Sequence, residues 1–202
     1  MASAALHRAL TDHHAVRPLP DAVRDLLEAL DAPPRLAAHL RLVHDVAHRL
    51  VEWTARHHPA VEVDREAVLF GAATHDIGKT VHVEELSGPG SAHELAGHAL
   101  LRDRGVEERL ARFARTHASW TEPGIEVEDL LVSVADKVWK AKRVDDLEQL
   151  LVARFAAANG EPGWAVFLAL DDELDRIAAG ADERLAVQAA HPIGSGPERW
   201  TS

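Results

Sequence analysis

Hydrophobic residues recur at intervals of three and four along most of the chain, which is the spacing of amphipathic helices. Leu36, Leu40, Val43 and Leu50 follow this interval in the first long stretch. The same spacing predicts helices at 21–32, 35–58, 64–77, 92–104, 106–117, 125–143, 144–158 and 164–179. Residues 1–20 are expected to form an arm or a short helix, and the segment from 181 is only weakly helical. The pattern predicts an all-α fold.

The predicted helix 64–77 differs from the others because almost every residue from Ala67 onward is apolar or small. A helix that is apolar all round is buried on all sides. This one ends in His75-Asp76, followed by Gly78, for which the pattern predicts the left-handed turn that closes many helices. Burying unpartnered polar groups is costly. A divalent cation satisfies a nitrogen and an oxygen lone pair together, so His75 and Asp76 are the first candidate metal ligands.

Other polar residues mark the ends of predicted helices. Asp21 is expected to cap the helix 21–32, and Asp64 is expected to begin the helix 64–77. Ser91 and Glu94 have the spacing of a capping box before the helix 92–104, and Gly105 is expected to end that helix. Residues 81–90 contain Gly-Pro-Gly and are predicted to form a loop.

The composition agrees with a helical protein of one domain. The chain has 202 residues, of which 47% are hydrophobic and only 4% aromatic, and alanine and leucine dominate. This length is enough for one domain with a substantial core. We expect an N-terminal arm at 1–20, a single helical domain at 21–180 and a C-terminal tail at 181–202.

Charge and cysteine content narrow the range of functions. With 33 acidic against 22 basic residues, the net charge of −11 opposes binding to a nucleic acid duplex. The chain has no cysteine, so a metal would need His, Asp, Glu or water as ligands. No apolar run approaches the roughly 20 residues of a membrane span, and the N-terminus lacks the apolar core of a signal peptide. We therefore expect a cytoplasmic protein without a membrane partner; the oligomeric state stays open.

Further histidines and one aspartate could join His75 and Asp76. His44 and His48 lie four residues apart on one face of the helix 35–58, and their spacing alone does not decide which of them is functional. Asp136 stands between Val134 and Val138, on the apolar face of the helix 125–143. A carboxylate in that position needs a partner. His44, the pair His75-Asp76 and Asp136 belong to three different helices, which can converge on one ion.

The order His44, His75-Asp76, Asp136 resembles the HD-domain superfamily of metal-dependent phosphohydrolases, over residues 36–143. The strongest element is the run from His75 to Lys79, which closes a helix of small apolar residues as the central motif of that superfamily does. The resemblance implies a helical bundle in which His44, His75, Asp76 and Asp136 bind a divalent metal. It also places His93 and His117 at a second ion or at the substrate phosphate, with Asp76 shared between the two ions.

The resemblance implies the hydrolysis of a phosphate ester by metal-bound hydroxide, in a nucleotide or another small phosphorylated metabolite. Asp76, His93, His117 and Lys79 are the candidate catalytic residues. Lys79, Lys137 and Arg143 are candidates for contact with the substrate phosphate, because the basic residues at 137–143 form a cluster in an acidic chain. The ligand types do not distinguish one ion from two, or Mn, Fe, Co, Ni, Mg and Zn from one another.

Two other functions are compatible with the same residues. A branch of the superfamily uses the ligand order His, His-Asp, His, His, Asp to hold two irons and to cleave C–H or C–P bonds with dioxygen. A degenerate HD domain could instead serve as a regulatory module. We favour the hydrolase because Lys79 and the basic cluster suit an anionic substrate, and because every ligand position is filled.

Overall fold

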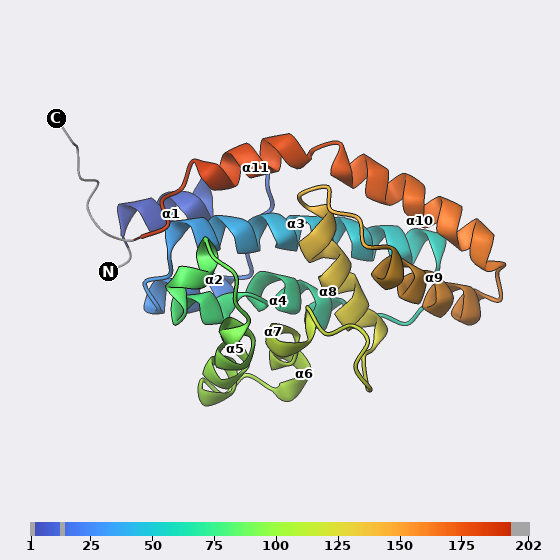
Figure 1. Cartoon of the computed structure of the whole chain (residues 1–202), viewed down its shortest axis with the longest axis horizontal. Coiled ribbons are helices and arrows are strands. Elements are labelled where there is room, and N and C mark those ends of the chain that lie inside the picture. Colours follow the sequence, from blue (N-terminus) through green and yellow to red (C-terminus); the bar gives the residue numbers. More distant parts are fainter. Residues whose placement is uncertain (1–2, 13–14, 195–202) are drawn as a thin grey trace.

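The computed structural model describes residues 3–12 and 15–194, and every regular element within these ranges is a helix (Figure 1). This confirms the all-α fold. Within the same ranges no helix combines the length and the apolar character needed to span a membrane. The helices are α1 (Ala4–Thr11), α2 (Asp21–Ala29), α3 (Pro34–His57), α4 (Arg65–Thr74), η1 (Ile77–Thr80), η2 (Val83–Leu86), α5 (Ala92–Asp103), α6 (Glu108–Ala111), α7 (Phe113–Thr116), α8 (Val127–Val138), α9 (Asp145–Asn159), α10 (Gly163–Ala178) and α11 (Ala181–Ala189).

The long helix α3 runs through the middle of the molecule, and the other helices pack around it (Figure 1). In the view of Figure 1, α10 and α11 follow one long edge, while α4 to α7 lie on the opposite side of α3. Most residues of α3 are buried, including polar ones such as His39 and Asp45. A helix in this position can present side chains to several neighbours at once.

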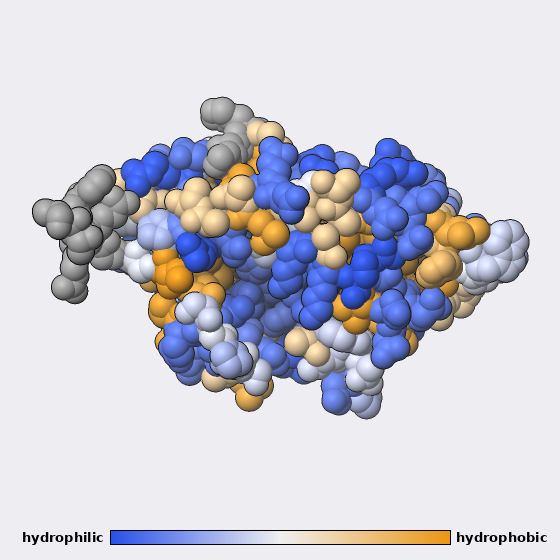
Figure 2. Space-filling model, turned by 45° about the horizontal axis from the view of Figure 1, so that its top comes forward, coloured by the Kyte–Doolittle hydropathy of each residue, from blue (hydrophilic) through white to orange (hydrophobic). Residues whose placement is uncertain are grey.

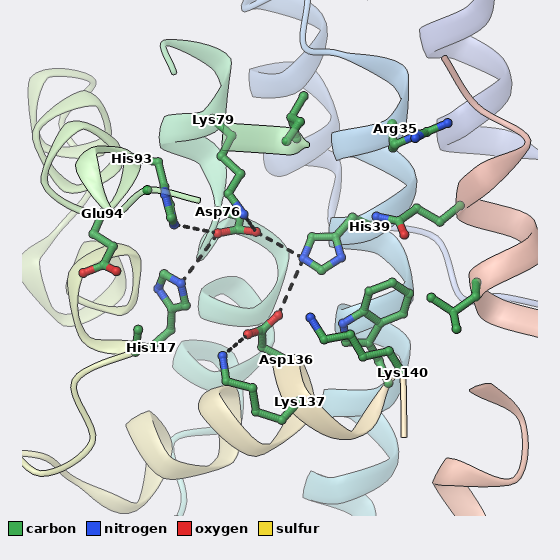
Figure 3. A pocket seen from close by; sticks show the side chains of 16 residues that line it. Arg35, His39, Asp76, Lys79, His93, Glu94, His117, Asp136, Lys137 and Lys140 are labelled. Carbon is green, nitrogen blue, oxygen red and sulfur yellow. Dashed lines mark hydrogen bonds and ion pairs between the residues drawn. The ribbon is translucent and has the colours of Figure 1, made fainter. Parts of the chain in front are cut away.

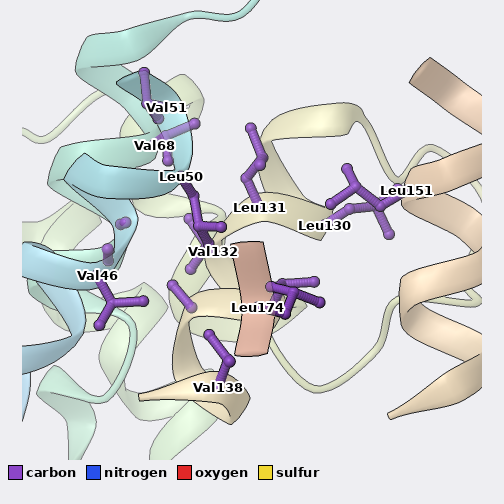
Figure 4. Packing of buried hydrophobic residues seen from close by; sticks show 14 of the residues in the cluster. Val46, Leu50, Val51, Val68, Leu130, Leu131, Val132, Val138, Leu151 and Leu174 are labelled. Carbon is purple, nitrogen blue, oxygen red and sulfur yellow. The ribbon is translucent and has the colours of Figure 1, made fainter. Parts of the chain in front are cut away.

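The hydrophobic core has two parts along α3. The larger part joins the C-terminal half of α3 to α4, α8, α9 and α10, and it includes Leu50, Val68, Leu131, Leu151 and Leu174 (Figure 4). The smaller part joins α1, α2 and the beginning of α3 to α4, α5 and α6. On the face drawn in Figure 2, hydrophilic residues predominate and the exposed hydrophobic residues form separate groups.

The predicted helix 64–77 ends three residues earlier than expected. It begins where expected, and Asp64 is its N-cap, since Asp64 Oδ1 accepts a hydrogen bond of 3.0 Å from the amide of Ala67. The predicted cap at Asp21 is not formed, because the N-cap of α2 is Pro20. The α-helix ends at Thr74, and the short 3-10 helix η1 begins at Ile77. His75 and Asp76 therefore lie at the junction between two helices, and both are buried.

Gly78 does not form the predicted left-handed turn. The described glycines with a positive φ are Gly105, Gly124 and Gly160, so only the prediction for Gly105 is confirmed. Gly78 is needed because two backbones meet there: an added Cβ would lie 1.9 Å from the carbonyl oxygen of His93 and 2.6 Å from the amide of Gly97. This close approach sets α5 directly against η1 and brings His93 towards Asp76.

The predicted capping box at Ser91 is also not formed. Ser91 is the N-cap residue of α5, but its side chain makes no capping hydrogen bond. Glu85, from the loop that precedes the helix, takes this role: its Oε1 accepts from the amide of Ala92 at 3.1 Å, and its Oε2 from the amide of His93 at 3.2 Å. The predicted loop 81–90 thus contains a helical turn, η2, that carries the capping carboxylate.

The remaining differences concern helix ends and the C-terminus. The predicted helix 106–117 is divided into α6 and α7, and the predicted helix 125–143 ends at Val138. The expected tail begins with the regular helix α11, while its end, 195–202, lies outside the described residues. Arg35, at the start of α3, donates hydrogen bonds to the carbonyl oxygens of His191 (2.9 Å) and Ala189 (3.3 Å). These bonds attach the end of α11 to the main bundle.

Candidate metal centre

Six buried side chains from separate parts of the fold meet beside the middle of the bundle. They form two groups, each with ligand atoms close enough to hold one ion: His39, His75 and Asp136 in the first, and Asp76, His93 and His117 in the second. His39 comes from α3, and His75 and Asp76 come from the junction of α4 and η1. His93 comes from α5, His117 from the end of α7, and Asp136 from α8. Packing of α3, α4, α5 and α8 against one another thus builds the site.

The first group has the dimensions of a metal site. His39 Nε2 lies 3.2 Å from His75 Nε2 and 3.7 Å from Asp136 Oδ1, and His75 Nε2 lies 3.4 Å from the same oxygen. Metal-ligand bonds of about 2.0–2.2 Å place neighbouring ligand atoms about 3–3.6 Å apart. The three atoms therefore stand at distances that one divalent ion could span.

Asp76 connects the two groups, because its two oxygens face different histidines. Oδ2 lies 3.3 Å from His39 Nε2 and 3.6 Å from His75 Nε2. Oδ1 lies 3.0 Å from His93 Nε2 and 3.6 Å from His117 Nε2. In Figure 3, Asp76 stands between His93 and His117 on one side and His39 on the other. One carboxylate can thus contribute to both groups.

The histidine rings are oriented by contacts at their far nitrogens. His75 Nδ1 lies 2.9 Å from the carbonyl oxygen of Ala72, His117 Nδ1 lies 3.2 Å from that of Phe113, and His93 Nδ1 lies 2.5 Å from Glu85 Oε2. Each acceptor holds the ring proton on Nδ1 and leaves the Nε2 lone pair pointing into the site, as in histidine ligands of metals. Asp76 Oδ1 and His93 Nε2 are buried without a hydrogen-bond partner among the described residues. These orphaned acceptors fit a divalent cation.

Burial and neighbouring charges set the protonation states. Burial lowers the pKa of His39 and lowers that of His117 to about 4, so both imidazoles are neutral at pH 7. Burial is the largest influence and by itself would raise the pKa of the carboxyl groups of Asp76 and Asp136. The neighbouring His75 acts together with hydrogen bonds from His39 and His93 to Asp76, and with Lys137 beside Asp136, and the combined effect holds both pKa values well below the usual range. Neutral imidazoles and ionised carboxylates are the forms that bind metals.

Comparison with known proteins agrees with this geometry. The family model described as the HD domain matches residues 36–139, just over half of the chain, and all six residues of the two groups lie within the match. The chain belongs to the HD domain family. The members of this family are typically metal-dependent phosphohydrolases, so the fold and the composition of the site agree at the family level with a metal-dependent hydrolase.

The chain is also similar to part of one curated protein, a tRNA (cytidine(56)-2'-O)-methyltransferase from Picrophilus torridus. The two are 25% identical over an alignment of 146 positions, which covers 62% of this chain and 38% of that protein. The chain thus matches well under half of its relative's length. No solved structure matches the chain.

His44, the predicted first ligand of the HD domain, lies away from the two groups. Its ring is next to that of His48, with 6.4 Å between the centroids, and burial lowers its pKa to about 4. His39 occupies the predicted place, and sequence reasoning missed it. Five residues of an α-helix correspond to a rotation of about 140°, so the two side chains leave α3 on different sides. Helical spacing does not reveal which side of α3 faces α4. The prediction is therefore corrected: His39, and not His44, lies with the other candidate ligands.

His39, and not His44, lies in the first group of candidate ligands, and variants of the two histidines test this assignment. We expect His39→Ala to weaken the binding of the ion in the first group by about 100-fold or more, because a direct ligand is lost. We expect His44→Ala, on the same helix and equally buried, to leave metal binding unchanged. Titration of the metal-free protein with Mn²⁺, followed by calorimetry, measures both. Loss of metal from His44→Ala with normal binding by His39→Ala would contradict this assignment.

The cavity at the two groups has a volume of about 410 Å³ and contains several cationic side chains (Figure 3). Lys79 Nζ lies 2.6 Å from Asp76 Oδ2, and Lys137 Nζ lies 2.6 Å from Asp136 Oδ2. Both were predicted contacts for a substrate phosphate, and the structure places both on the cavity wall. Lys140 and Arg35 also line it, so four cations surround a site in an otherwise acidic protein.

Arg143, the third predicted phosphate contact, does not line this cavity. Its guanidinium group lies 2.7 Å from Glu148 Oε2, 2.6 Å from Asp171 Oδ1 and 2.7 Å from Asp175 Oδ1. These carboxylates belong to α9 and α10, so Arg143 joins the two C-terminal helices. Arg143 was predicted to contact the phosphate, and this prediction needs correction. The residue lies beyond the end of α8 at Val138, and three carboxylates already balance the charge of its guanidinium group.

Proposed function

We propose that this HD domain is a phosphohydrolase that cleaves a phosphate ester in a small anionic metabolite. The observation that carries the proposal is the position of Asp76, which faces two groups of candidate ligands at the base of a cavity lined by cations. Enzymes that act on phosphoryl groups combine metal ions with Lys or Arg side chains around the transferred oxygens. The lysines of this site distinguish it from a metal site that serves only for structure.

The ligand sets divide between two ions. His39, His75 and Asp136 with Asp76 Oδ2 would hold one ion, and His93 and His117 with Asp76 Oδ1 would hold the second. Divalent ions bound there would supply Lewis-acid activation of water and of a phosphoryl oxygen. The mixture of imidazole and carboxylate ligands is compatible with Mn, Fe, Co, Ni, Mg or Zn.

The side chains around the ligands bind and orient the substrate. Lys79 and Lys137 each contact a carboxylate with one ammonium group, and an ammonium has three protons to donate. The remaining protons can be donated to phosphate oxygens, which would place the phosphorus next to Asp76. The positive charge of Lys79 would also stabilise the negative charge that develops on the leaving-group oxygen of the ester.

Activity measurements test this proposal. The purified protein, loaded in turn with each of the six metals, should release phosphate or a phosphorylated product from at least one compound in panels of nucleotides, phosphomonoesters and phosphodiesters. Removal of the metal with a chelator should abolish the activity, and its return should restore it. Inactivity on every panel with every metal, although the metals bind, would overturn the proposal.

A second candidate function follows from the same six residues. Four histidines and two aspartates in two groups also suit a pair of irons, the set used by oxygenases that cleave C–H or C–P bonds. Anaerobic reconstitution with iron, followed by electron paramagnetic resonance and by measurement of oxygen uptake, separates the two functions. A coupled mixed-valence signal together with substrate-dependent oxygen uptake would favour the oxygenase, and full activity without oxygen would exclude it.

Glu85 provides a further prediction for this site, because its carboxylate holds both the ring and the amide of His93. We expect Glu85→Gln to weaken binding of the ion in the second group by about 10–100-fold, since a carboxylate on Nδ1 orients the ligand and increases its basicity. The ion in the first group should bind normally. Stepwise titration with Mn²⁺ measures the two affinities separately.

Glu84→Gln is the matched control for this variant. Glu84 is the preceding residue, and it is exposed and contacts only His82, at 3.3 Å, among the ion pairs of the described residues. Its replacement should change neither affinity. Two unchanged affinities in Glu85→Gln would show that the short contact with His93 does not position the ligand.

A further inference from the structure

Helix α11 forms one wall of the cavity that contains the candidate metal ligands. Leu185 and Gln188 both line this cavity. They are three residues apart and so lie on the same face of the helix. Both residues come after the segment matched by the HD domain family, which ends at 139. The wall is therefore a feature of this chain's own C-terminal part.

Two arginines fix α11 in position. The buried Arg184 donates from Nε to the carbonyl oxygen of Trp139 at 2.6 Å and from Nη2 to that of Ile177 at 2.5 Å. At the other end, Arg35 donates to the carbonyl oxygens of Ala189 and His191. Trp139 in turn packs edge-on against the ring of His39, with 4.9 Å between centroids. The wall is thus held at a defined place relative to the first group of ligands.

The chemistry of this wall differs from that of the cations around the ligands. Leu185 is one of the exposed large hydrophobic residues, with 40% of its surface accessible. The amide of Gln188 can both donate and accept hydrogen bonds. A bare phosphate ion would be bound by Lys79 and Lys137 and would leave Leu185 in water. Contact with an apolar group removes that surface from water and is favourable.

We propose that α11 determines the substrate specificity of the site, with Leu185 packing against the organic group of a phosphate ester and Gln188 binding a polar atom of that group. This inference rests on the proposed phosphohydrolase function. It deepens that function, because it requires a substrate whose organic part extends from the metal ligands to α11. Inorganic phosphates and very small esters would miss this contact.

Binding of two unreactive phosphonates tests the inference without turnover. The full chain is loaded with Mn²⁺ and titrated in a calorimeter with methylphosphonate, whose organic part is a single methyl group, and with benzylphosphonate, whose organic part is a larger apolar group. In the unaltered protein benzylphosphonate should bind about 10-fold more tightly. In Leu185→Ala this ratio should fall by about fivefold, while the affinity for methylphosphonate stays the same.

Two further variants complete the design. Leu185→Asn keeps the approximate size but removes the apolar surface, so it should lower the ratio as Leu185→Ala does. Leu168→Ala is the matched control: Leu168 is 55% exposed on α10, and it does not line the cavity. In Leu168→Ala the ratio of the affinities for benzylphosphonate and methylphosphonate should equal that of the unaltered protein. Leu185 and Leu168 are both exposed, so neither substitution should disturb the core.

The possible results separate this inference from the proposed function. If the metal-loaded protein binds both phosphonates and the ratio is unchanged in the Leu185 variants, the role of α11 is overturned and the phosphohydrolase proposal stands. The same holds if the two phosphonates bind equally well to the unaltered protein. If neither phosphonate binds although the metal is present, both proposals are overturned.

Discussion

Replacing Asp76 with Asn is expected to remove both ions and to lower any metal-dependent hydrolysis by about 1,000-fold or more. A carboxylate offers a negatively charged oxygen to each of the two groups, whereas an amide offers one neutral oxygen and a nitrogen that donates hydrogen bonds. The nitrogen would face either His39 and His75 or His93 and His117, and in both cases it would oppose an ion. Asn has nearly the same size as Asp, so the helical fold should be retained.

Metal content per chain, the rate of hydrolysis and the circular dichroism of the helices measure this effect. The control is Asp45→Asn, in the second His-Asp dipeptide of the chain. Asp45 is as buried as Asp76, but it pairs with Arg17 at 3.0 Å and Arg49 at 3.1 Å, away from the cavity. This variant should lose some stability and keep both ions. Retention of two ions by Asp76→Asn would refute the shared carboxylate.

Replacing Gly78 with Ala is expected to destabilise the protein by about 3 kcal/mol or more, at the upper end of the usual cost of overpacking. The added Cβ would stand 1.9 Å from the carbonyl oxygen of His93 and 2.6 Å from the amide of Gly97. Both neighbours are backbone atoms, so no side chain can rotate away. The first turns of α5 would have to move, and His93 would move with them.

Thermal unfolding should show this loss as a decrease in Tm of about 10 °C, because each kcal/mol corresponds to about 2–4 °C in a domain of this size. Titration with Mn²⁺ should also show weaker binding in the second group. Gly163→Ala is the matched control, since nothing lies within 4 Å of an added Cβ at this position, where α10 begins. An unchanged Tm in Gly78→Ala would contradict the close approach of the two backbones.

The sequence was sufficient for the parts of the site that depend on local pattern. His75 and Asp76 stand out because they end a run of small apolar residues, and Asp136 because it interrupts an apolar helical face. Each signal comes from a few neighbouring residues, and the structure brings all three residues together. His93 and His117 join them, as the resemblance to the HD-domain superfamily had implied.

Several assignments failed where a choice depended on contacts between distant residues. His39 and His44 are on one helix, and only the position of α4 decides which of them faces His75. Ser91 has the right spacing for a cap, but in the structure the carboxylate of Glu85, from the preceding loop, accepts the hydrogen bonds of the amides of Ala92 and His93. Arg143 belongs to a basic cluster in the sequence, yet in the fold it faces the carboxylates of α9 and α10.

The sequence by itself determined the helical fold and the family, and it singled out His75 and Asp76 as candidate ligands, because the hydrophobic repeat and the His-Asp motif are encoded within one or two helical turns. Only the tertiary structure decided which histidine of α3 joins the candidate ligands, why position 78 needs a glycine, which residue pairs with His93 and which helix forms the far wall of the cavity. These features arise from the rotation and the approach of helices that are far apart in the chain. Such relations are set by packing over the whole core, which no local pattern specifies.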